Sequence, residues 1–174
     1  RQMCIRDSPC FLLGDEQGLG KTKQAIDIAV SRKHEFRHCL IVCCVSGLKW
    51  NWAKEVEIHS NEQAHIIGSR VNRKGNLTID GVQKRVEDLL LDHKEYFLIT
   101  NIETLRDKSF TSALKELTNA GEIGMVVVDE IHKCKNPTSQ QGEALHSLNS
   151  FYKIGLTGTP LLNSPVDTLS LIHI

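Results

Sequence analysis

Short apolar runs alternate along the chain with stretches in which apolar residues recur at helical spacing. The runs are rich in Ile, Leu and Val, as buried strands of a parallel sheet tend to be. They predict strands at Cys10–Leu13, Cys39–Cys43, Phe97–Thr100, Met125–Val128 and Lys153–Leu156, with a weaker one at Ile66–Ile67.

Between these runs, three stretches carry one apolar face each and predict helices that cover the sheet. The facing residues are Ala25, Ile28 and Ala29 in 21–32, Trp52, Val56 and His59 in 48–59, and Val82, Val86, Leu89 and Leu90 in 82–93. Strands alternating with helices predict an α/β fold with a mainly parallel sheet. The polar, glycine-punctuated segment Gly68–Gly81 predicts an exposed loop or a short hairpin insertion.

The two ends of the chain do not share this pattern. RQMCIRDS and LSLIHI resemble translations of the inverted ends of transposon-based sequencing adapters. We therefore expect residues 1–8 and 169–174 to be adapter-derived, and residues 9–168 to be one domain from a longer reading frame. Without these ends the chain has 19 basic and 20 acidic residues, so no strong basic field indicates a nucleic-acid partner.

Cysteine usage indicates the compartment. Outside the ends, five cysteines remain in no C-x-x-C arrangement, so disulfides and a zinc site are not expected. Three of them fall in the apolar run CLIVCCV and fit small core hydrophobes. A reducing, intracellular location follows: the cytoplasm or nucleoid in bacteria or phage, the nucleus in eukaryotes. No apolar run approaches about 18 residues, so no membrane span is predicted.

The stretch GDEQGLGKT, Gly14 to Thr22, combines glycines with GKT between a predicted strand and a predicted helix. A phosphate loop needs this context, because its backbone N–H groups and the helix N-terminus face the anion. Lys21 is predicted to reach the β- and γ-phosphates, and the Thr22 hydroxyl to bind Mg²⁺. Asp15 occupies the place of the usual first glycine, and GKT alone is too common to decide the matter.

A second, independent feature is MVVVDEIH, Met125 to His132, where an apolar strand ends in two carboxylates. Ligands bind at the carboxyl ends of strands in open α/β sheets. Asp129 is predicted to hold Mg²⁺ directly or through water, and Glu130 to orient and deprotonate the attacking water. Alone, DE after a strand is more often a solvated strand end, but after a phosphate loop it indicates nucleoside triphosphate hydrolysis.

Five ordered segments, DEQGLGKT, LIVCCVSGLKWNWAKE, FLITNIETLR, VVVDEIHKCKNP and LTGTPLLNSP, resemble motifs I, Ia, Ib, II and III of the Swi/Snf-type branch of superfamily II helicase-like ATPases. The resemblance covers nearly all of residues 9–168. It implies a three-layer RecA-like P-loop NTPase lobe that uses ATP and Mg²⁺, binds duplex DNA and works with a second RecA-like lobe. The family's loop usually reads DEMGLGKT, so Asp15 is its normal residue.

The resemblance also implies roles for individual residues. The nucleotide contacts would be Asp15, Gly18, Leu19, Gly20, Lys21, Thr22, Asp129 and Glu130, with Lys21 and Glu130 catalytic and Thr22 and Asp129 holding the metal. The residues that couple hydrolysis to DNA movement would be His132, Thr157, Gly158 and Thr159. The DNA-backbone contacts would be Ser46, Lys49, Thr100 and Asn101. A lone histidine such as His132 is otherwise more often structural.

Three departures from the family pattern bear on these expectations. Ile131 replaces the alanine of DEAH, which is expected to change packing and little of the chemistry. Cys44 replaces a common proline and Ile102 a common tyrosine, which leaves the DNA contacts open. Core packing is expected for Trp52, and Trp50 stays undecided between packing and base stacking.

Two other functions remain open from the sequence. One is the ATPase lobe of a restriction-type or RNA-directed DEAH protein, which shares motifs I and II, although LKWNWAKE and the KNP after DEIH disfavour it. The other is a regulatory nucleotide-binding module that hydrolyses nothing. A second lobe with arginine-bearing motifs in the parent reading frame would distinguish the ATPase from this module.

Overall fold

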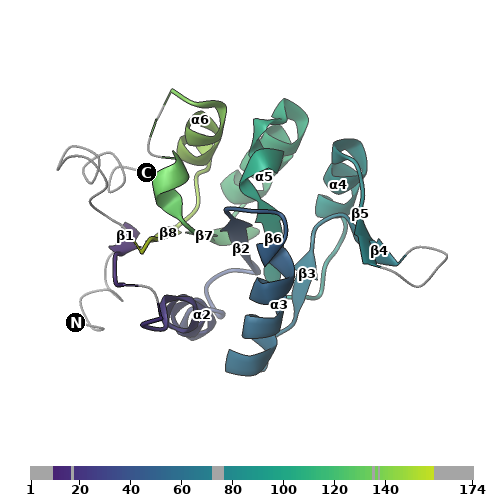
Figure 1. The fold of residues 1–174 in the computed structure, drawn as a ribbon. Helices are drawn as coiled ribbons and strands as arrows, with labels where there is room; N and C mark the ends of the chain where they lie inside the picture. Colours follow the sequence, from purple (N-terminus) through teal and green to yellow (C-terminus); the bar gives the residue numbers. More distant parts are fainter. Residues whose placement is uncertain (1–9, 17, 72–76, 135, 137, 159–174) are drawn as a thin grey trace.

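A six-stranded parallel sheet runs through the centre of the molecule (Figure 1). The computed structural model describes residues 10–16, 18–71, 77–134, 136 and 138–158. The expected adapter-derived segments lie outside this range. In spatial order the strands are β1 (Cys10–Leu13), β8 (Tyr152–Leu156), β7 (Ile123–Val128), β2 (His38–Cys43), β6 (Phe97–Asn101) and β3 (Ala64–Ile66).

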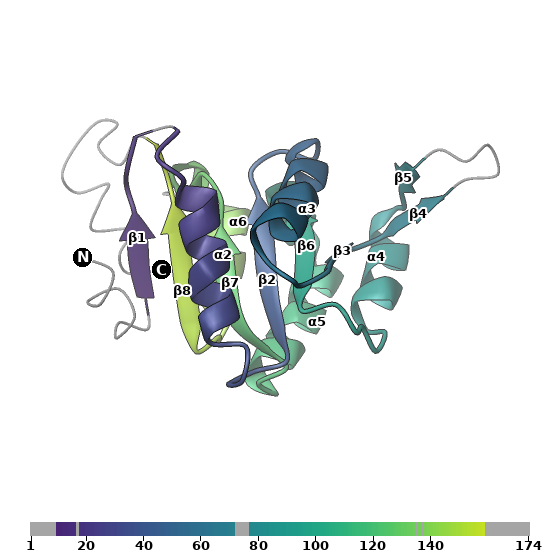
Figure 2. The same ribbon diagram turned by 90° about the horizontal axis from the view of Figure 1, so that it is seen from below.

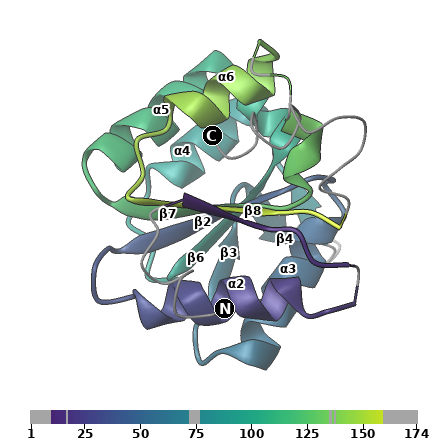
Figure 3. The same ribbon diagram turned by 90° about the vertical axis from the view of Figure 1, so that its left-hand side faces the viewer.

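Helices cover both faces of the sheet, as Figures 2 and 3 show. One face carries α2 (Lys21–Ser31) and α3 (Leu48–His59). The other carries α4 (Val82–Leu89), α5 (Lys108–Asn119) and α6 (Gln140–Ser147). Two short 3-10 helices, η1 (Ile102–Arg106) and η2 (Ile131–Cys134), follow β6 and β7. The three-layer α/β fold with a parallel sheet is confirmed, and all six predicted strands are present.

The two layers of the core follow from the alternation of side chains along the central strands. In β2, Leu40 and Val42 pack with the residues of α4, α5 and α6, whereas Cys39, Ile41 and Cys43 pack with α2 and α3. All five side chains are fully buried. Burying a side chain such as Ile41 stabilises the fold by about 1.5–3 kcal/mol, so the central strands contribute much of the stability of the sheet.

Cysteines in this core are small hydrophobic groups, as expected. None of the described cysteines forms a disulfide. Burial raises the pKa of the Cys134 thiol to about 12, which keeps it protonated and unreactive at neutral pH. Among the described residues, no helix has the length and apolar character needed to cross a membrane.

The α5 and α6 helices are present although no helix was predicted at either place. Helix α5 begins after Asp107, whose carboxylate accepts hydrogen bonds from the backbone N–H groups of Ser109 and Phe110. Its buried residues Phe110, Ala113 and Leu114 have helical spacing. Helix α6 has Ser139 as its N-cap, bonded to the Gly142 N–H. In both cases the side-chain cap satisfies backbone donors that a helix start leaves open.

The segment after β3 forms the predicted hairpin. Strands β4 (Ser69–Val71) and β5 (Leu77–Ile79) pair antiparallel outside the main sheet. Helix α4, which follows, ends at Leu89, so the expectation that Leu90 packs on the sheet was wrong: its side chain is 55% exposed. Leu90 is the C-cap residue of α4, where the chain leaves the helix, so the predicted helical face is not continued beyond it.

The isoleucine that departs from DEAH has a packing partner. Ile131 is buried at the start of η2 and lies over Gly155 of β8. A Cβ atom added at Gly155 would lie 2.7 Å from Ile131 Cδ1, so this glycine leaves the space that the larger side chain fills. The observed contact agrees with the expected packing role of Ile131.

Candidate functional site

The predicted motifs meet at one edge of the sheet because parallel strands present all their carboxyl ends there. The neighbouring strands β1, β8 and β7 end next to one another and continue into Gly14, Thr157 and Asp129. Backbone hydrogen bonds hold the last two in place: Thr157 N–H donates to Leu13 O at 3.0 Å, and Asp129 N–H to Val42 O at 2.9 Å. The loop, the carboxylates and the third motif are thus adjacent.

The loop after β1 has the backbone of an anion site. Gly18 and Gly20 have positive φ angles of 82° and 73°, which a side chain would strain. Gly20 is the N-cap of α2 and offers no side chain to the first N–H groups of the helix. Leu19, between them, is exposed, and its carbonyl accepts a hydrogen bond from the Gln24 side chain. The helix N-terminus is therefore open to an anion.

The Lys21 side chain folds back onto the loop that precedes it. Its Nζ donates to the Asp15 carbonyl at 2.6 Å and to the Glu16 carbonyl at 2.7 Å. The ammonium group is thus held against the loop, close to the N-terminus of α2. Thr22 follows in the first turn of α2 and is half-buried.

Asp129 lies half-buried at the end of β7. Burial raises the pKa of its carboxyl above the usual range, while a hydrogen bond from Trp52 Nε1 at 3.0 Å acts in the opposite direction. Trp52 therefore packs in the core, as predicted, and also orients the carboxylate. Sequence reasoning missed this second role, which only the fold reveals because Trp52 precedes Asp129 by 77 positions. A cation beside Asp129 would favour its charged form.

Glu130 adopts an unusual backbone conformation, with a φ angle of 49° in the left-handed region. Its Oε2 lies 3.1 Å from His132 Nδ1, and the same nitrogen lies 3.0 Å from Thr157 Oγ1. His132 therefore bridges the second carboxylate and the third motif. Gly158 is half-buried beside Thr157, and Thr159 lies outside the described residues. The coupling role of these residues stays a prediction.

The residues predicted to contact DNA differ in exposure. Ser46 is exposed in the loop after β2. Lys49, Thr100 and Asn101 are buried, with exposed fractions of 1%, 2% and 4%. Lys49 Nζ donates to Asn101 Oδ1 at 3.1 Å. Lys49 therefore binds the Asn101 side chain at the end of β6, and its ammonium group is shielded from solvent.

A network of polar side chains surrounds this pair. Asn101 Oδ1 also accepts a hydrogen bond from Thr104, and Thr104 accepts one from Arg85 of α4 at 2.7 Å. Asn101 in turn donates to Glu103. Burial lowers the pKa of Lys49, and the nearby Arg85 charge lowers it further. Arg85, Thr104 and Glu103 were missed from the sequence, where nothing marks them beyond ordinary polar character.

Substituting Lys49 tests whether this ammonium group supports the fold. We expect Lys49→Ala to lower the free energy of unfolding by about 2–5 kcal/mol, because it leaves a cavity and removes a donor from Asn101. Ser46→Ala, at an exposed position, should change it by less than about 0.5 kcal/mol. Denaturant unfolding measures both. Unchanged stability with weaker DNA binding in Lys49→Ala would instead favour a direct phosphate contact.

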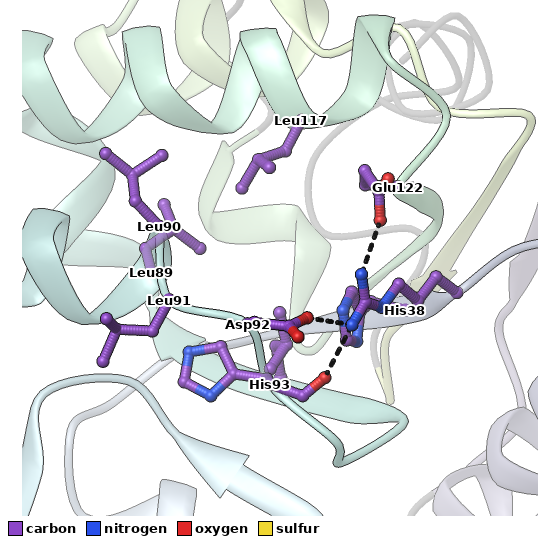
Figure 4. A pocket seen from close by; sticks show the side chains of 10 residues that line it. His38, Leu89, Leu90, Leu91, Asp92, His93, Leu117 and Glu122 are labelled. Carbon is purple, nitrogen blue, oxygen red and sulfur yellow. Dashed lines mark hydrogen bonds and ion pairs between the residues drawn. The ribbon is translucent and has the colours of Figure 1, made fainter.

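A cavity of about 270 Å³ lies at the opposite edge of the sheet (Figure 4). It is lined by residues at the start of β2, just before β7 and at the end of α4, among them His38, Glu122 and Leu89. Arg37 also lines it and forms ion pairs with Asp92 and Glu122. Because it lies at the amino ends of the strands, this cavity is separate from the phosphate loop.

Comparison with known proteins places the chain in a family. Residues 4–174 match the model of the SNF2-related domain. The DNA repair and recombination protein RAD54-like of Mus musculus is 31% identical over 177 residues, which are 93% of this chain and 22% of that protein. Chromodomain-helicase-DNA-binding protein 1 of Gallus gallus is 32% identical over 168 residues, 93% of this chain and 9% of that protein. The chain thus spans less than a quarter of these relatives.

Solved structures agree. The Sulfolobus solfataricus SWI2/SNF2 ATPase core in complex with dsDNA superposes with a TM-score of 0.71 and 25% identity, covering 98% of this chain and 32% of that one. The Pyrococcus furiosus Hef helicase domain, with a TM-score of 0.69 and 16% identity over 98% of this chain and 34% of that one, shares the fold. The expected RecA-like lobe is confirmed, and the chain belongs to the SNF2-related domain family.

Proposed function

We propose that this chain is the ATP-binding lobe of a DNA-dependent ATPase of the Swi/Snf type, which couples ATP hydrolysis to movement along duplex DNA. One observation carries the proposal. The open helix N-terminus after Gly20, the Asp129–Glu130 pair and the His132–Thr157 contact lie at one sheet edge. Phosphoryl transfer needs an anion cradle, a metal-binding carboxylate and a water-orienting group together, and these residues supply all three.

The residues present fit Mg-ATP. Thr22 and Asp129 offer hydroxyl and carboxylate oxygens, which Mg²⁺ prefers. Mg²⁺, when bound, would neutralise charge on the phosphates. Lys21 would exchange its two loop carbonyls for phosphate oxygens, and its reach over the loop already suits that exchange. Glu130 would orient and deprotonate the attacking water, with His132 holding its carboxylate.

The proposed partners are duplex DNA and a second RecA-like lobe of the longer protein. Support for DNA comes from family membership and from the Sulfolobus solfataricus ATPase core, which is in complex with dsDNA. In this proposal the second lobe supplies an arginine to the γ-phosphate, as phosphoryl-transfer sites require cationic groups there. Action on DNA also implies an intracellular location, in the cytoplasm or nucleoid if the protein is from bacteria or phage and in the nucleus if it is eukaryotic.

A steady-state ATPase assay tests the proposal. We expect the longer protein to hydrolyse ATP faster when duplex DNA is added, and this chain alone to show no such stimulation, because the arginine proposed to come from the second lobe would be absent. Lys21→Ala in the longer protein is the matched control and should remove the stimulated rate.

Other outcomes of the same assay favour the alternatives. Stimulation by RNA but not by duplex DNA would indicate an RNA-directed protein. ATP binding without hydrolysis under every condition would indicate a regulatory nucleotide-binding module. Strong DNA stimulation of this chain alone would disprove the two-lobe requirement.

A further inference from the structure

Two histidines and one aspartate lie close together beside β3, which is the outer strand of the sheet on the side away from β1. His65 belongs to β3, Asp88 to α4, and His93 follows α4. One potential ligand atom from each residue lies within 4.8 Å of the other two, the only such group of three or more His, Cys, Asp or Glu residues within the described part of the chain. We propose that His65, Asp88 and His93 form a binding site for a divalent transition-metal ion of the zinc class.

The fold assembles the three side chains on one face. In the parallel pairing of β3 with β6, His65 lies opposite Leu98, and Leu98 packs in the core layer that faces α4. His65 therefore points toward α4, where its Nε2 lies 2.8 Å from Asp88 Oδ2. The rings of His65 and His93 stack with centroids 4.3 Å apart. Both imidazoles are thus held beside one carboxylate.

The ligand chemistry fits zinc. Imidazole nitrogen and carboxylate oxygen bind Zn²⁺ at about 2.0–2.2 Å, which places tetrahedral ligand atoms about 3.3 Å apart. The ligand atoms lie within 4.8 Å of one another, so movements of roughly an ångström would bring them to this spacing. Three protein ligands leave one coordination position for water or another ligand.

Outer contacts suit a metal-binding histidine. His93 Nε2 lies 2.7 Å from the Asp88 backbone carbonyl, and its Nδ1 lies 4.0 Å from Glu95 Oε2. If Nδ1 binds the ion, Nε2 keeps its hydrogen bond to the Asp88 carbonyl, as the second nitrogen of a metal-binding histidine usually does. Arg37 Nη2 donates to the backbone carbonyl of His93 at 3.4 Å.

The site can be reached from solvent. The exposed fractions of the side chains are 22% for His65, 20% for Asp88 and 8% for His93. The side chains are therefore packed by their neighbours over most of their surface, yet part of each surface is accessible to an ion from solvent.

The site is separate from the ATP edge. Strands β1 and β3 are the two outer strands of the sheet, with four strands between them. At about 4.8 Å per strand, His65 lies roughly 24 Å across the sheet from the strand that carries the phosphate loop. Metal bound here would therefore be independent of the Mg²⁺ proposed at Thr22 and Asp129.

Occupancy would stiffen the base of the hairpin. Asp88 Oδ2 also accepts the Gly68 N–H at 2.6 Å, just before β4 begins. An ion on Asp88 would tie β3, the start of β4 and α4 to one point. One turn earlier in α4, Arg85 contacts Thr104 and the Asp80 carbonyl. The metal would thus order the helix that leads from the hairpin to the Lys49–Asn101 network.

Metal titration without nucleotide tests this site. The purified chain, freed of metal with a chelator, is titrated with Zn²⁺ by calorimetry and with Co²⁺ by absorption spectroscopy. We expect one ion per chain and a higher melting temperature with Zn²⁺. His65→Ala and His93→Ala should each weaken Zn²⁺ binding by about 100-fold or more, since even outer-shell changes cost about 10–100-fold.

Three further variants make the result decisive. His34→Ala, at a side chain 78% exposed, and Cys10→Ser should bind Zn²⁺ as tightly as the unaltered chain. Asp88→Asn keeps an oxygen that can accept the Gly68 N–H, so this variant should fold. Circular dichroism without metal checks its folding. We expect it to bind Zn²⁺ more weakly than the unaltered chain. Zn²⁺ affinity that is equal in His65→Ala, or absent from the unaltered chain, would overturn the proposal.

Discussion

Replacing Glu130 with glutamine in the longer protein should lower ATP turnover by about 10²–10⁴-fold while ATP still binds. Glutamine keeps the size of the side chain and an oxygen for His132, which lies 3.1 Å from the carboxylate. It cannot accept a proton from water. Single-turnover hydrolysis gives the rate of the chemical step, and calorimetry gives the ATP affinity.

Glu143→Gln provides the matched control for this experiment. Glu143 is an exposed carboxylate in the first turn of α6 and belongs to none of the motifs that form the site. It should leave turnover unchanged. A parallel loss of ATP affinity in Glu130→Gln would instead show that Glu130 shapes the site without acting as the base.

Lys21→Ala should weaken ATP binding by roughly 100-fold or more. Hydrogen bonds to charged groups contribute about 1.5–3 kcal/mol each, and every 1.4 kcal/mol is tenfold in affinity. Lys21 already donates two hydrogen bonds to the loop and would make equivalent bonds to phosphate oxygens. Calorimetric titration with a slowly hydrolysed ATP analogue measures the loss.

Lys23 offers a control two residues away. It is exposed on α2 and pairs with Asp27 at 2.5 Å, an i,i+4 contact on the solvent side. Lys23→Ala removes the same charge and should leave ATP affinity unchanged. If both lysine variants bind ATP equally well, the phosphate-loop assignment is wrong.

The sequence predicted the sheet better than the helices around it. Buried parallel strands are continuous apolar runs, so the fully buried residues of β2 and β7 could be recognised directly. Helix α5 has an equally regular apolar face at Phe110, Ala113 and Leu114, so its position could also be predicted from the sequence. Helix α6 has eight residues and two glutamines at its start, which gives little periodicity to detect.

The site shows a similar division. Residues whose chemistry depends on neighbours in the chain, such as Gly20 and Lys21, could be predicted because a short motif contains the whole loop. Contacts between strand ends could not. The Trp52–Asp129 and Lys49–Asn101 hydrogen bonds join positions 77 and 52 residues apart. The family resemblance indicated that these segments matter without showing that Lys49 is buried.

The histidine cluster is the clearest case of information that exists only in the fold. His65 and Asp88 are 23 positions apart, and no motif with metal-ligand spacing connects them. Strand order and the register of β3 against β6 bring them together. Spacing rules for metal sites cover ligands on one turn or one helix, and therefore miss sites made across a sheet edge.

The left-handed backbone at Glu130 has a consequence for directed evolution. Outside glycine and asparagine this conformation costs about 1–2 kcal/mol, so a glycine at position 130 would relax the chain. It would also remove the carboxylate proposed to activate water. A library selected for thermal stability alone should therefore enrich glycine at this position and yield inactive proteins, whereas selection for turnover should retain the strained glutamate.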